Sequence, residues 1–584
     1  MPGLVMRGAT PLLVDTMAPF GEEWLCVWVG CAGRVPDLMR RLSYSHGVST
    51  TALLGQTIGD NLESALDRVP ERDALVSCHQ SLRLSYAEFN AAVDGLATGL
   101  LRAGIDRGDR VGIWSPNCAE WSLVQYATAK VGAILVNVNP AYRTHELEYV
   151  LRQSGIRLLV SSAGYKTSDY RAMATEVAAT VETLERSVFI GDDDWEELTR
   201  TPVDADAISR RMAGLSFDDP INIQYTSGTT GSPKGATLTH HNILNNGFFV
   251  GELTHISEKD RICVPVPFYH CFGMVMGNLA ATSHGACVVI PAPTFEPEAT
   301  LEAVQAERCT SLYGVPTMFI AQLEHPRFPE FDLSSLRTGI MAGSPCPVEV
   351  MKRVVSDMHM SEVSICYGMT ETSPVSTQTR ADDPLQLRVA TVGRPGPHVE
   401  VKIVDAESGL TVERGGRGEL CTRGYSVMLG YWDEPDKTAE AIDRAGWMHT
   451  GDLATMDENG YCKIVGRSKD MVIRGGENVY PREIEEFLYS HPAIADVQVV
   501  GVPDERYGEE LCAWVLLRDG VSGLDAEAVH EFCDGKLAHY KIPRYVLVVE
   551  GFPMTITGKV QKYKMREESI ARLRLEGAAQ IATA

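Results

Sequence analysis

Between residues 56 and 162 the chain alternates helical periodicity with short apolar runs. Early apolar residues fall on one helical face: Ile58, Leu62 and Leu66. Ser85 and Glu88 then have the spacing of a capping box for a helix that continues to about Leu101. Runs rich in Val, Ile and Leu follow at 110–115, 133–138 and 157–162, separated by helical segments. This alternation predicts a parallel sheet covered by helices on both faces.

Further along the chain the pattern of apolar runs and turn residues changes twice. Apolar runs at 263–270, 286–292 and 335–343 predict more strands of the same kind, whereas 392–466 reads as short strands and turns, a β-rich subdomain. After the Gly475-Gly476 pair, a helix is expected to begin at Pro481 and to open a small α+β segment. The predicted fold is α/β, with a large N-terminal domain and a small mobile C-terminal domain. The expected boundaries are a leader at 1–44, a domain at 45–466, a hinge at 467–470 and a lid at 471–584.

Composition narrows the class of protein. With 584 residues, 44% hydrophobic and 22% charged, the chain is expected to form at least two well-cored domains. A net charge of −24 repels nucleic acid, so no nucleic-acid partner is expected. The 14 cysteines include no C-x-x-C pair, which predicts reduced thiols, no zinc site and a cytoplasmic location. No apolar run approaches the ~20 residues of a membrane span, and the leader fits a signal peptide poorly.

One loop is rich in groups that bind anions. Residues 225–236 read YTSGTTGSPKGA, in which hydroxyl side chains alternate with glycines and Lys234 comes near the end. Backbone amides and hydroxyls of such a loop can surround a phosphate, although a glycine-rich surface turn has similar letters. Lys234 follows Pro233 and precedes Gly235, so the run does not match the P-loop of kinases and GTPases. We expect a nucleotide phosphate to be held here in another way.

Six motifs in one order resemble the adenylate-forming superfamily of acyl-CoA synthetases, peptide-synthetase adenylation domains and luciferases. They are YTSGTTGSPKG, PFYHCFGM (267–274), CYGMTE (366–371), GWMHTGDL (446–453), GRSKDMVIRGGENVYP (466–481) and MTITGKVQK (554–562). Together with SYSHG at 43–47 they are most similar to medium-chain fatty acyl-CoA synthetases. The resemblance covers about 45–570 and implies ATP and Mg²⁺ as cofactors, with CoA as co-substrate.

The resemblance implies a nucleotide site. It places the ATP phosphates on Thr226, Ser227, Gly228, Thr229, Thr230, Gly231 and Lys234. Magnesium would be held by Glu371 and Thr226, and Thr370 would contact phosphate. The nucleotide site would also include Gly343, Tyr367, Gly368, Asp452 and Arg467, with Tyr367 stacked on adenine, Asp452 accepting both ribose hydroxyls and Arg467 contacting ribose and phosphate. On residue type alone, Thr370 and Glu371 would equally suit the first turn of a helix, and Tyr367 a hydrophobic core.

The resemblance also assigns the chemistry. His270 would lie beside the carboxylate and the α-phosphate, and Lys559 would bridge them during adenylation. Lys469 occupies the hinge, and the face that carries Gly475 and Gly476 would later line a tunnel for pantetheine. Solvated surface positions are the plainer interpretation for Arg467 and Lys559.

The leading hypothesis is a fatty acid–CoA ligase that works through an acyl-adenylate. A fatty acyl-adenylate ligase that loads a carrier protein is the alternative, and a luciferase-type oxygenase shares the same motifs. Expected partners are a fatty acid, ATP and CoA, with a homodimer as one option for assembly. Residues around 272–278 and 342–345 are the expected lining of the acyl pocket.

Overall fold

The computed structural model describes residues 42–226, 233–343, 346–405, 407–467, 470–474, 477–504, 507–521, 523–534, 536–537, 539–555 and 560–579. Most of the predicted leader lies outside these ranges. Its last three residues belong to the fold, because Leu42 bridges Glu413 and strand β1 (Tyr44–His46) begins at Tyr44.

A seven-stranded sheet contains the first three predicted strands. Its order is β21 (Gly430–Tyr431), β11 (Lys234–Thr239), β10 (Pro220–Thr226), β5 (Ile134–Asn137), β4 (Arg110–Trp114), β6 (Ile156–Ser161) and β9 (Arg186–Phe189). The strands from β10 to β9 are parallel. Helices α4 (Ala119–Val131), α5 (Thr144–Ser154) and α6 (Tyr170–Ala178) connect them, which confirms the predicted alternation.

A nine-stranded sheet lies next to it. Its order is β18 (Arg394–Pro395), β17 (Val375–Gln378), β16 (Glu362–Gly368), β15 (Thr338–Ala342), β14 (Ser311–Gly314), β12 (Arg261–Cys263), β13 (Cys287–Ile290), β2 (Asp73–Ser77) and β3 (Leu82–Ser85). The predicted strand at 263–270 is wrong: β12 ends at Cys263, and a π-helix, η1 (Phe272–Leu279), follows. Pro265 and Pro267 have no backbone N–H to donate, so the run cannot continue a ladder.

One buried core joins the two sheets. Side chains from both sheets pack on helices α2 (Ile58–Arg68), α3 (Tyr86–Arg102), α4, α9 (His240–Leu253), η1 and α10 (Ala280–His284). Ile58 and Leu62 are buried, and Leu66 is half-buried. The predicted capping box is present, since Ser85 and Glu88 exchange side-chain to backbone hydrogen bonds. The shared core fixes the two sheets relative to each other.

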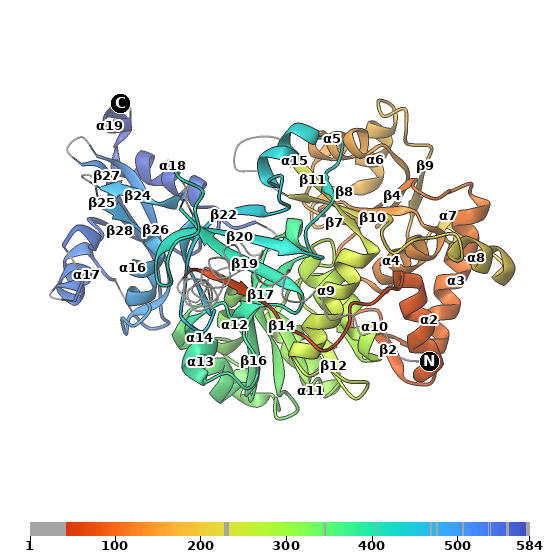
Figure 1. Cartoon of the computed structure of the whole chain (residues 1–584), viewed down its shortest axis with the longest axis horizontal. Coiled ribbons are helices and arrows are strands. Elements are labelled where there is room, and N and C mark those ends of the chain that lie inside the picture. The colour runs from red at the N-terminus through yellow and green to blue at the C-terminus, as the bar shows by residue number, and fades with distance from the viewer. Residues whose placement is uncertain are drawn as a thin grey trace, which may run out of the picture.

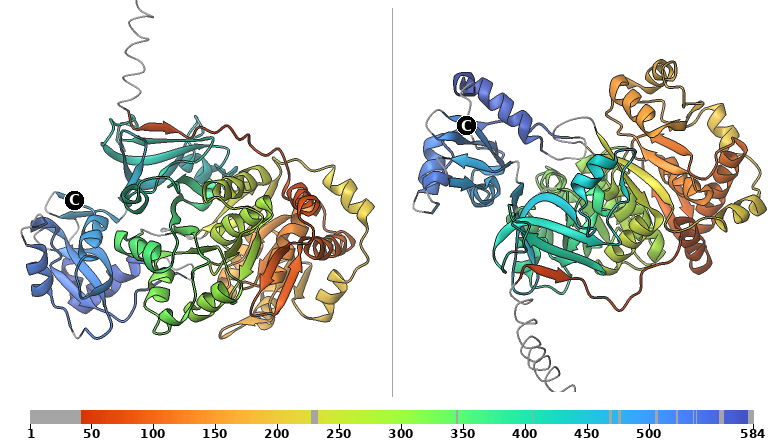
Figure 2. Two further views of the ribbon diagram at one scale, coloured as in Figure 1. Left: turned by 90° about the horizontal axis from the view of Figure 1, so that it is seen from below. Right: turned by 45° about the horizontal axis from the view of Figure 1, so that its top comes forward.

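The segment predicted to be β-rich does form a third sheet, and its strand pairs are all antiparallel (Figure 2). Its order is β1, β19 (Val399–Val404), β20 (Arg417–Gly424), β22 (Met448–Met456) and β23 (Cys462–Arg467). Outside these three sheets, the large part of the chain contains further elements. They are α7 (Asp193–Thr199), α8 (Ala205–Met212), α11 (Pro297–Ala306), α12 (Pro316–Leu323), η2 (Phe328–Glu330), α13 (Val348–Asp357), η3 (Thr370–Thr372), α14 (Leu385–Ala390), α15 (Pro435–Ala441) and the hairpin of β7 (Gly164–Tyr165) and β8 (Ser168–Asp169).

The C-terminal segment forms a separate body at one end of the molecule (Figure 1). Its sheet contains β25 (Glu477–Val479), β24 (Val472–Arg474), β27 (Gly508–Leu517), β26 (Ile494–Asp504) and β28 (Tyr545–Val548), with α16 (Pro481–Leu488), α17 (Ala526–Cys533), η5 (His539–Lys541), α18 (Lys562–Leu573) and α19 (Glu576–Ala579). It has its own buried cores. Contact with the large part includes Arg482, which donates to the carbonyl oxygen of Cys346 over 3.1 Å.

Two predictions from composition can be compared with the described residues. The twelve cysteines within these ranges are all free, in agreement with the predicted reduced thiols. None of the helices within these ranges is both long enough and apolar enough to cross a bilayer.

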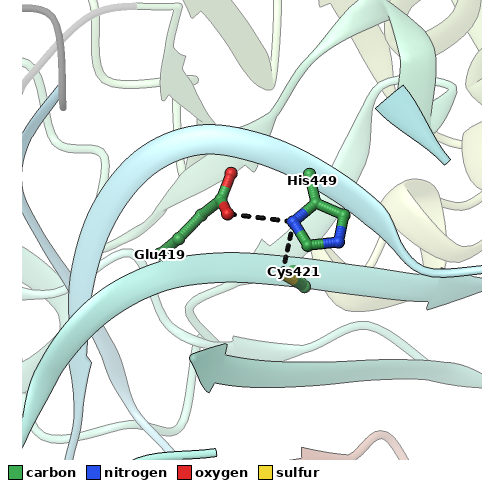
Figure 3. Close-up of side chains that lie close together, drawn as sticks. All are labelled: Glu419, Cys421 and His449. Atoms are coloured by element: carbon green, nitrogen blue, oxygen red, sulfur yellow. Dashed lines mark hydrogen bonds and ion pairs between the residues drawn. The ribbon is translucent and has the colours of Figure 1, made fainter. Parts of the chain in front are cut away.

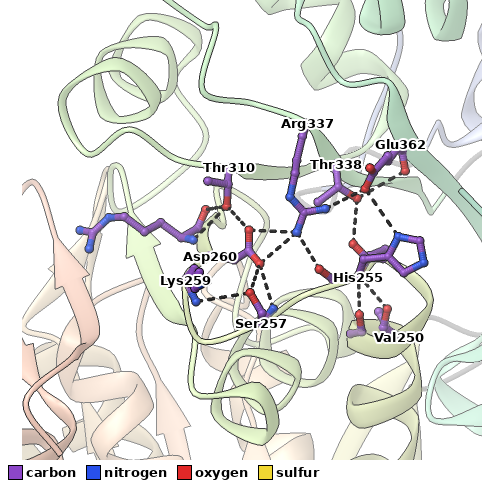
Figure 4. A network of polar contacts seen from close by, with 12 residues as sticks. Val250, His255, Ser257, Lys259, Asp260, Thr310, Arg337, Thr338 and Glu362 are labelled. Atoms are coloured by element: carbon purple, nitrogen blue, oxygen red, sulfur yellow. Dashed lines mark hydrogen bonds and ion pairs between the residues drawn. The ribbon is translucent and has the colours of Figure 1, made fainter. Parts of the chain in front are cut away.

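A polar network closes the amino ends of four parallel strands, β12, β14, β15 and β16 (Figure 4). The Arg337 guanidinium donates to both oxygens of Asp260, over 3.0 and 2.9 Å, and to Glu362 over 2.7 Å. Thr310 donates to Asp260 over 2.7 Å. The Asp260 side chain is only 5% exposed, so its charge depends on these partners.

Arg337→Met should lower the free energy of unfolding by about 3 kcal/mol, because it leaves the buried Asp260 carboxylate without its cation. Urea unfolding of the large domain measures this loss. The control is Arg327→Met, which breaks an ion pair on the surface and should cost less than about 1 kcal/mol. Equal losses for the two variants would contradict the assigned role of Arg337.

Candidate active site

The predicted site residues lie where parallel strands of two sheets end. Thr226 is the last residue of β10 in the seven-stranded sheet. Tyr367 and Gly368 end β16, and Gly343 directly follows β15, both in the nine-stranded sheet. Ligands of open α/β sheets bind at the carboxyl ends of their strands. These residues therefore gather at the carboxyl ends of strands from both sheets, and in the nine-stranded sheet this is the opposite end from the Arg337 network.

The phosphate loop begins and ends on paired strands. Thr226 and Lys234 face each other across β10 and β11. The predicted phosphate contacts Ser227, Gly228, Thr229, Thr230 and Gly231 lie outside the described residues. Because β10 and β11 are paired, the residues that flank the loop, Thr226 and Lys234, lie side by side.

Oxygen donors gather around Glu371, which begins the short helix η3 with Thr370. Oε1 of Glu371 lies 3.4 Å from the Thr226 hydroxyl and accepts a hydrogen bond from Tyr431 over 2.9 Å. A carboxylate and a hydroxyl are the hard donors that Mg²⁺ prefers, so the pair predicted from the motifs fits this ion. Glu371 is 5% exposed, so these neighbouring hydroxyl groups set the orientation of its carboxylate.

Tyr431 connects the two sides of this cluster. Tyr431 lies on β21, which pairs with β11. The Lys234 ammonium lies over the ring of Tyr431, 4.8 Å from its centroid, in a cation–π contact. Burial, reinforced by the neighbouring Glu371 carboxylate, raises the pKa of Tyr431, so its hydroxyl stays a hydrogen-bond donor. Tyr431 therefore positions both the predicted metal ligand and the predicted phosphate lysine.

The two predicted nucleoside contacts touch each other. The hydroxyl of Tyr367 donates to Oδ2 of Asp452 over 2.7 Å, although 85 positions separate them in sequence. Asp452 lies on β22, and its backbone pairs with that of Arg467 on β23. Gly368 is required beside them, because a Cβ there would lie 1.8 Å from the carbonyl oxygen of Pro374. Gly343 adopts a φ of +91°, a conformation that favours glycine.

His270 lies at the start of the π-helix η1. Its Nδ1 accepts a hydrogen bond from the backbone N–H of Phe272 over 3.2 Å, which places the proton of the neutral ring on Nε2. The neighbouring Cys271 sulfur lies 3.7 Å from the hydroxyl of Thr370. The residue that follows His270 therefore contacts Thr370, which directly precedes Glu371 in the chain. π-Helical turns are frequent at functional sites.

Several predicted residues lie outside the described part of the chain. These are Lys469, Gly475, Gly476 and Lys559, together with the side chain of Arg467. Their assigned roles stay predictions. Sequence reasoning missed Tyr431, whose only signal is its place in the turn-rich run LGYW.

Comparison with known proteins identifies the class. A family model described as AMP-binding enzyme matches residues 62–432, and its C-terminal domain model matches residues 483–559. The chain therefore belongs to the AMP-binding enzyme family. The predicted superfamily and fold are confirmed by these matches.

Two curated relatives extend over nearly the whole chain. The putative acyl-CoA synthetase YngI of Bacillus subtilis is 50% identical over 548 residues, which are 90% of this chain and 99% of the relative. The mitochondrial medium-chain acyl-CoA ligase ACSF2 of Homo sapiens is 44% identical over 559 residues, 91% of each chain.

Solved structures agree on the fold. The anthranilate CoA ligase AuaEII in complex with anthranoyl-AMP is similar, with a TM-score of 0.82, at 26% identity over 89% of this chain and 99% of that one. ATP-bound MatB from Rhodopseudomonas palustris has a TM-score of 0.76 at 30% identity, over 88% of this chain and 99% of that one.

Tyr431→Phe should weaken binding of Mg²⁺ with ATP by about tenfold or more, because a hydrogen bond that orients the ligand carboxylate is lost. Titration of Mn²⁺, followed by its electron paramagnetic resonance in the presence of ATP, measures this without turnover.

The control is Tyr461→Phe, which removes another tyrosine to carboxylate hydrogen bond, to Asp383, away from the site. It should leave the titration unchanged. If both variants bind the ion as the parent does, Tyr431 does not position Glu371.

Proposed function

We propose that this AMP-forming acyl-CoA ligase activates a medium-chain fatty acid with ATP and transfers the acyl group to CoA, with release of AMP and pyrophosphate. One observation carries the proposal: Thr226 contacts Glu371, and Tyr367, which lies four positions before Glu371 at the end of β16, contacts Asp452. The first set suits phosphates with their cation, and the second suits a nucleoside. The medium-chain preference is supported by the names of the ACSF2 relatives.

The chemistry explains why these groups are needed. A carboxylate acylates poorly, since its leaving oxide is too basic, and exchange of that oxide for AMP supplies a better leaving group. The acid must approach the α-phosphorus as an anion, so negative charge accumulates. Glu371 and Thr226 would hold Mg²⁺, which neutralises part of this charge when bound. Lys234 would contact the outer phosphates, and Asp452 offers two acceptor oxygens to the ribose hydroxyls.

His270 and the π-helix suit the acid substrate. The Nε2–H of a neutral His270 is a hydrogen-bond donor for the carboxylate or the α-phosphate. Directly after it, η1 contributes eight buried residues, FGMVMGNL, almost all apolar. We infer that the alkyl chain extends along this helix, as the expected lining at 272–278 implies.

The second half-reaction involves the C-terminal domain. We infer that Lys559 supports adenylation, and that rotation about the hinge at Lys469 then brings Gly475 and Gly476 to the site for CoA. CoA is favoured over a carrier protein as acceptor, because the relatives are named as acyl-CoA synthetases and ligases. The reduced cysteines favour the cytoplasm as location.

Acids of about six to twelve carbons should give the highest kcat/KM, since each buried methylene adds about 0.8 kcal/mol until the pocket is full. Pyrophosphate release across a panel of straight-chain, branched and aromatic acids measures the preference. A tenfold preference for acetate or for an aromatic acid would overturn the proposed substrate.

Lys559→Ala should slow acyl-adenylate formation about a hundredfold or more, the scale of one lost charge-stabilising group. Thioester formation from preformed acyl-adenylate and CoA should keep nearly its parent rate. Gly476→Leu is the matched opposite, with normal adenylation and a stalled second step. Single-turnover kinetics of each half-reaction separates them, and equal loss in both steps for Lys559→Ala would contradict domain rotation.

A further inference from the structure

Three potential metal ligands share one face of the third sheet, outside the ATP site (Figure 3). Glu419 and Cys421 are two positions apart on β20, so their side chains point to the same face. His449 on β22 is the direct cross-strand partner of Cys421. Residues directly opposite each other in an antiparallel pair also share a face. The strand register therefore brings a carboxylate, a thiol and an imidazole together.

The distances between these atoms approach those of a metal site. Nδ1 of His449 lies 2.9 Å from Oε2 of Glu419 and 3.5 Å from Sγ of Cys421. All three ligand atoms lie within 4.8 Å of one another. Tetrahedral bonds of about 2.0 Å to nitrogen or oxygen and about 2.3 Å to sulfur separate the ligands by roughly 3.3–3.6 Å. The two distances from Nδ1 are therefore within about 0.5 Å of the separations in a tetrahedral site.

The surroundings suit an ion with one open position. Cys421 is buried, whereas the Glu419 and His449 side chains are 20% and 34% exposed, which leaves a path from solvent. Oδ2 of Asp443 lies 3.8 Å from Nε2 of His449, on the far side of the ring from Nδ1. This distance is longer than a hydrogen bond, so a small shift would let the Asp443 carboxylate accept the Nε2 proton and orient the ring as a ligand.

A nearby cation does not occupy the cluster. Lys402 on β19 is the cross-strand neighbour of Cys421. Its ammonium lies 4.4 Å from the ring centroid of Trp447 and so is directed to the indole face.

We propose that Glu419, Cys421 and His449 form a Zn²⁺ site that is separate from the magnesium site, although the spacing of the cysteines predicted no zinc site. Thiolate, imidazole and carboxylate together are the donor set that Zn²⁺ takes, with water in the fourth position, whereas Mg²⁺ prefers oxygen alone. One thiolate and one carboxylate balance the charge of the ion. Zn²⁺ binds cysteine as the thiolate, so the Cys421 proton is released to solvent when the ion binds.

The site shares a backbone segment with the nucleotide site. The other oxygen of Glu419, Oε1, accepts from the N–H of Gly451 over 2.9 Å, and Gly451 directly precedes Asp452. An ion held by Glu419 and His449 is attached to the segment 449–451 at both ends. It binds His449 directly, and it reaches Gly451 through the hydrogen bond that Glu419 accepts. Bound Zn²⁺ should therefore raise the KM for ATP severalfold, a consequence that rests on the proposed role of Asp452.

Titration of the metal-free full chain with Co²⁺, a coloured substitute for Zn²⁺, tests the site without ATP. One equivalent should produce a thiolate-to-cobalt charge-transfer band, which Zn²⁺ should abolish by competition. Cys421→Ala should lose the band and weaken Zn²⁺ binding about tenfold or more. Cys462→Ala, which alters another buried cysteine of the same sheet, should retain both.

Two results would overturn the site: no band in the parent, or the same band in Cys421→Ala. If Cys421→Ala does not fold, Cys421→Ser keeps the side-chain size and should lose the same band. Glu419→Gln should weaken Zn²⁺ binding while the band remains. The ATP titration is a separate arm: Zn²⁺ should raise KM in the parent and not in Cys421→Ala, and an unchanged KM with bound ion would overturn the link to Asp452. Because the Co²⁺ arm contains no ATP, its failure is distinguishable from failure of the proposed ligase activity.

Discussion

The shared helical core holds the carboxyl ends of two parallel sheets against each other, and the site depends on this constraint. Thr226 ends a strand of one sheet, and Glu371 follows a strand of the other, yet their side-chain oxygens lie 3.4 Å apart. Neither sheet alone presents both donors. Because packed interiors deform little, helices α9 and η1 between the sheets set this separation more firmly than the two side chains could.

Charge is distributed differently at the two ends of the nine-stranded sheet. At the amino ends, Asp260 and Glu362 both accept hydrogen bonds from the cationic Arg337 guanidinium. At the carboxyl ends, Glu371 accepts hydrogen bonds from hydroxyl groups. The nearby Lys234, which belongs to the seven-stranded sheet, has its ammonium over the ring of Tyr431. Neither of these two contacts cancels a charge. In a chain with net charge −24, such local arrangement is what allows a triphosphate to be bound.

Helices and strands could be predicted from the sequence where local patterns determine them. Contacts that depend on the register of strand pairing could not. The apolar runs at 110–115 and 157–162 became β4 and β6, and Ser85 with Glu88 capped α3 as expected. The run at 263–270 looked equally strand-like, but two prolines ended the ladder, and a π-helix has no signal in a search for helical and strand periods. Motifs identified Tyr367 and Asp452 singly. That they touch, and that Cys421 faces His449, follows from strand pairing that no spacing in the sequence reveals.

The bond between Tyr367 and Asp452 bears on how the site receives a nucleotide. At least one oxygen of Asp452 is already engaged by the tyrosine hydroxyl. If a ribose binds this carboxylate as proposed and displaces the tyrosine hydroxyl, one hydrogen bond is exchanged for another. Exchange of one hydrogen bond for another changes the free energy little, since each is worth about 1 kcal/mol net. The bond therefore keeps the carboxylate and the ring in place before ATP arrives, without opposing its binding.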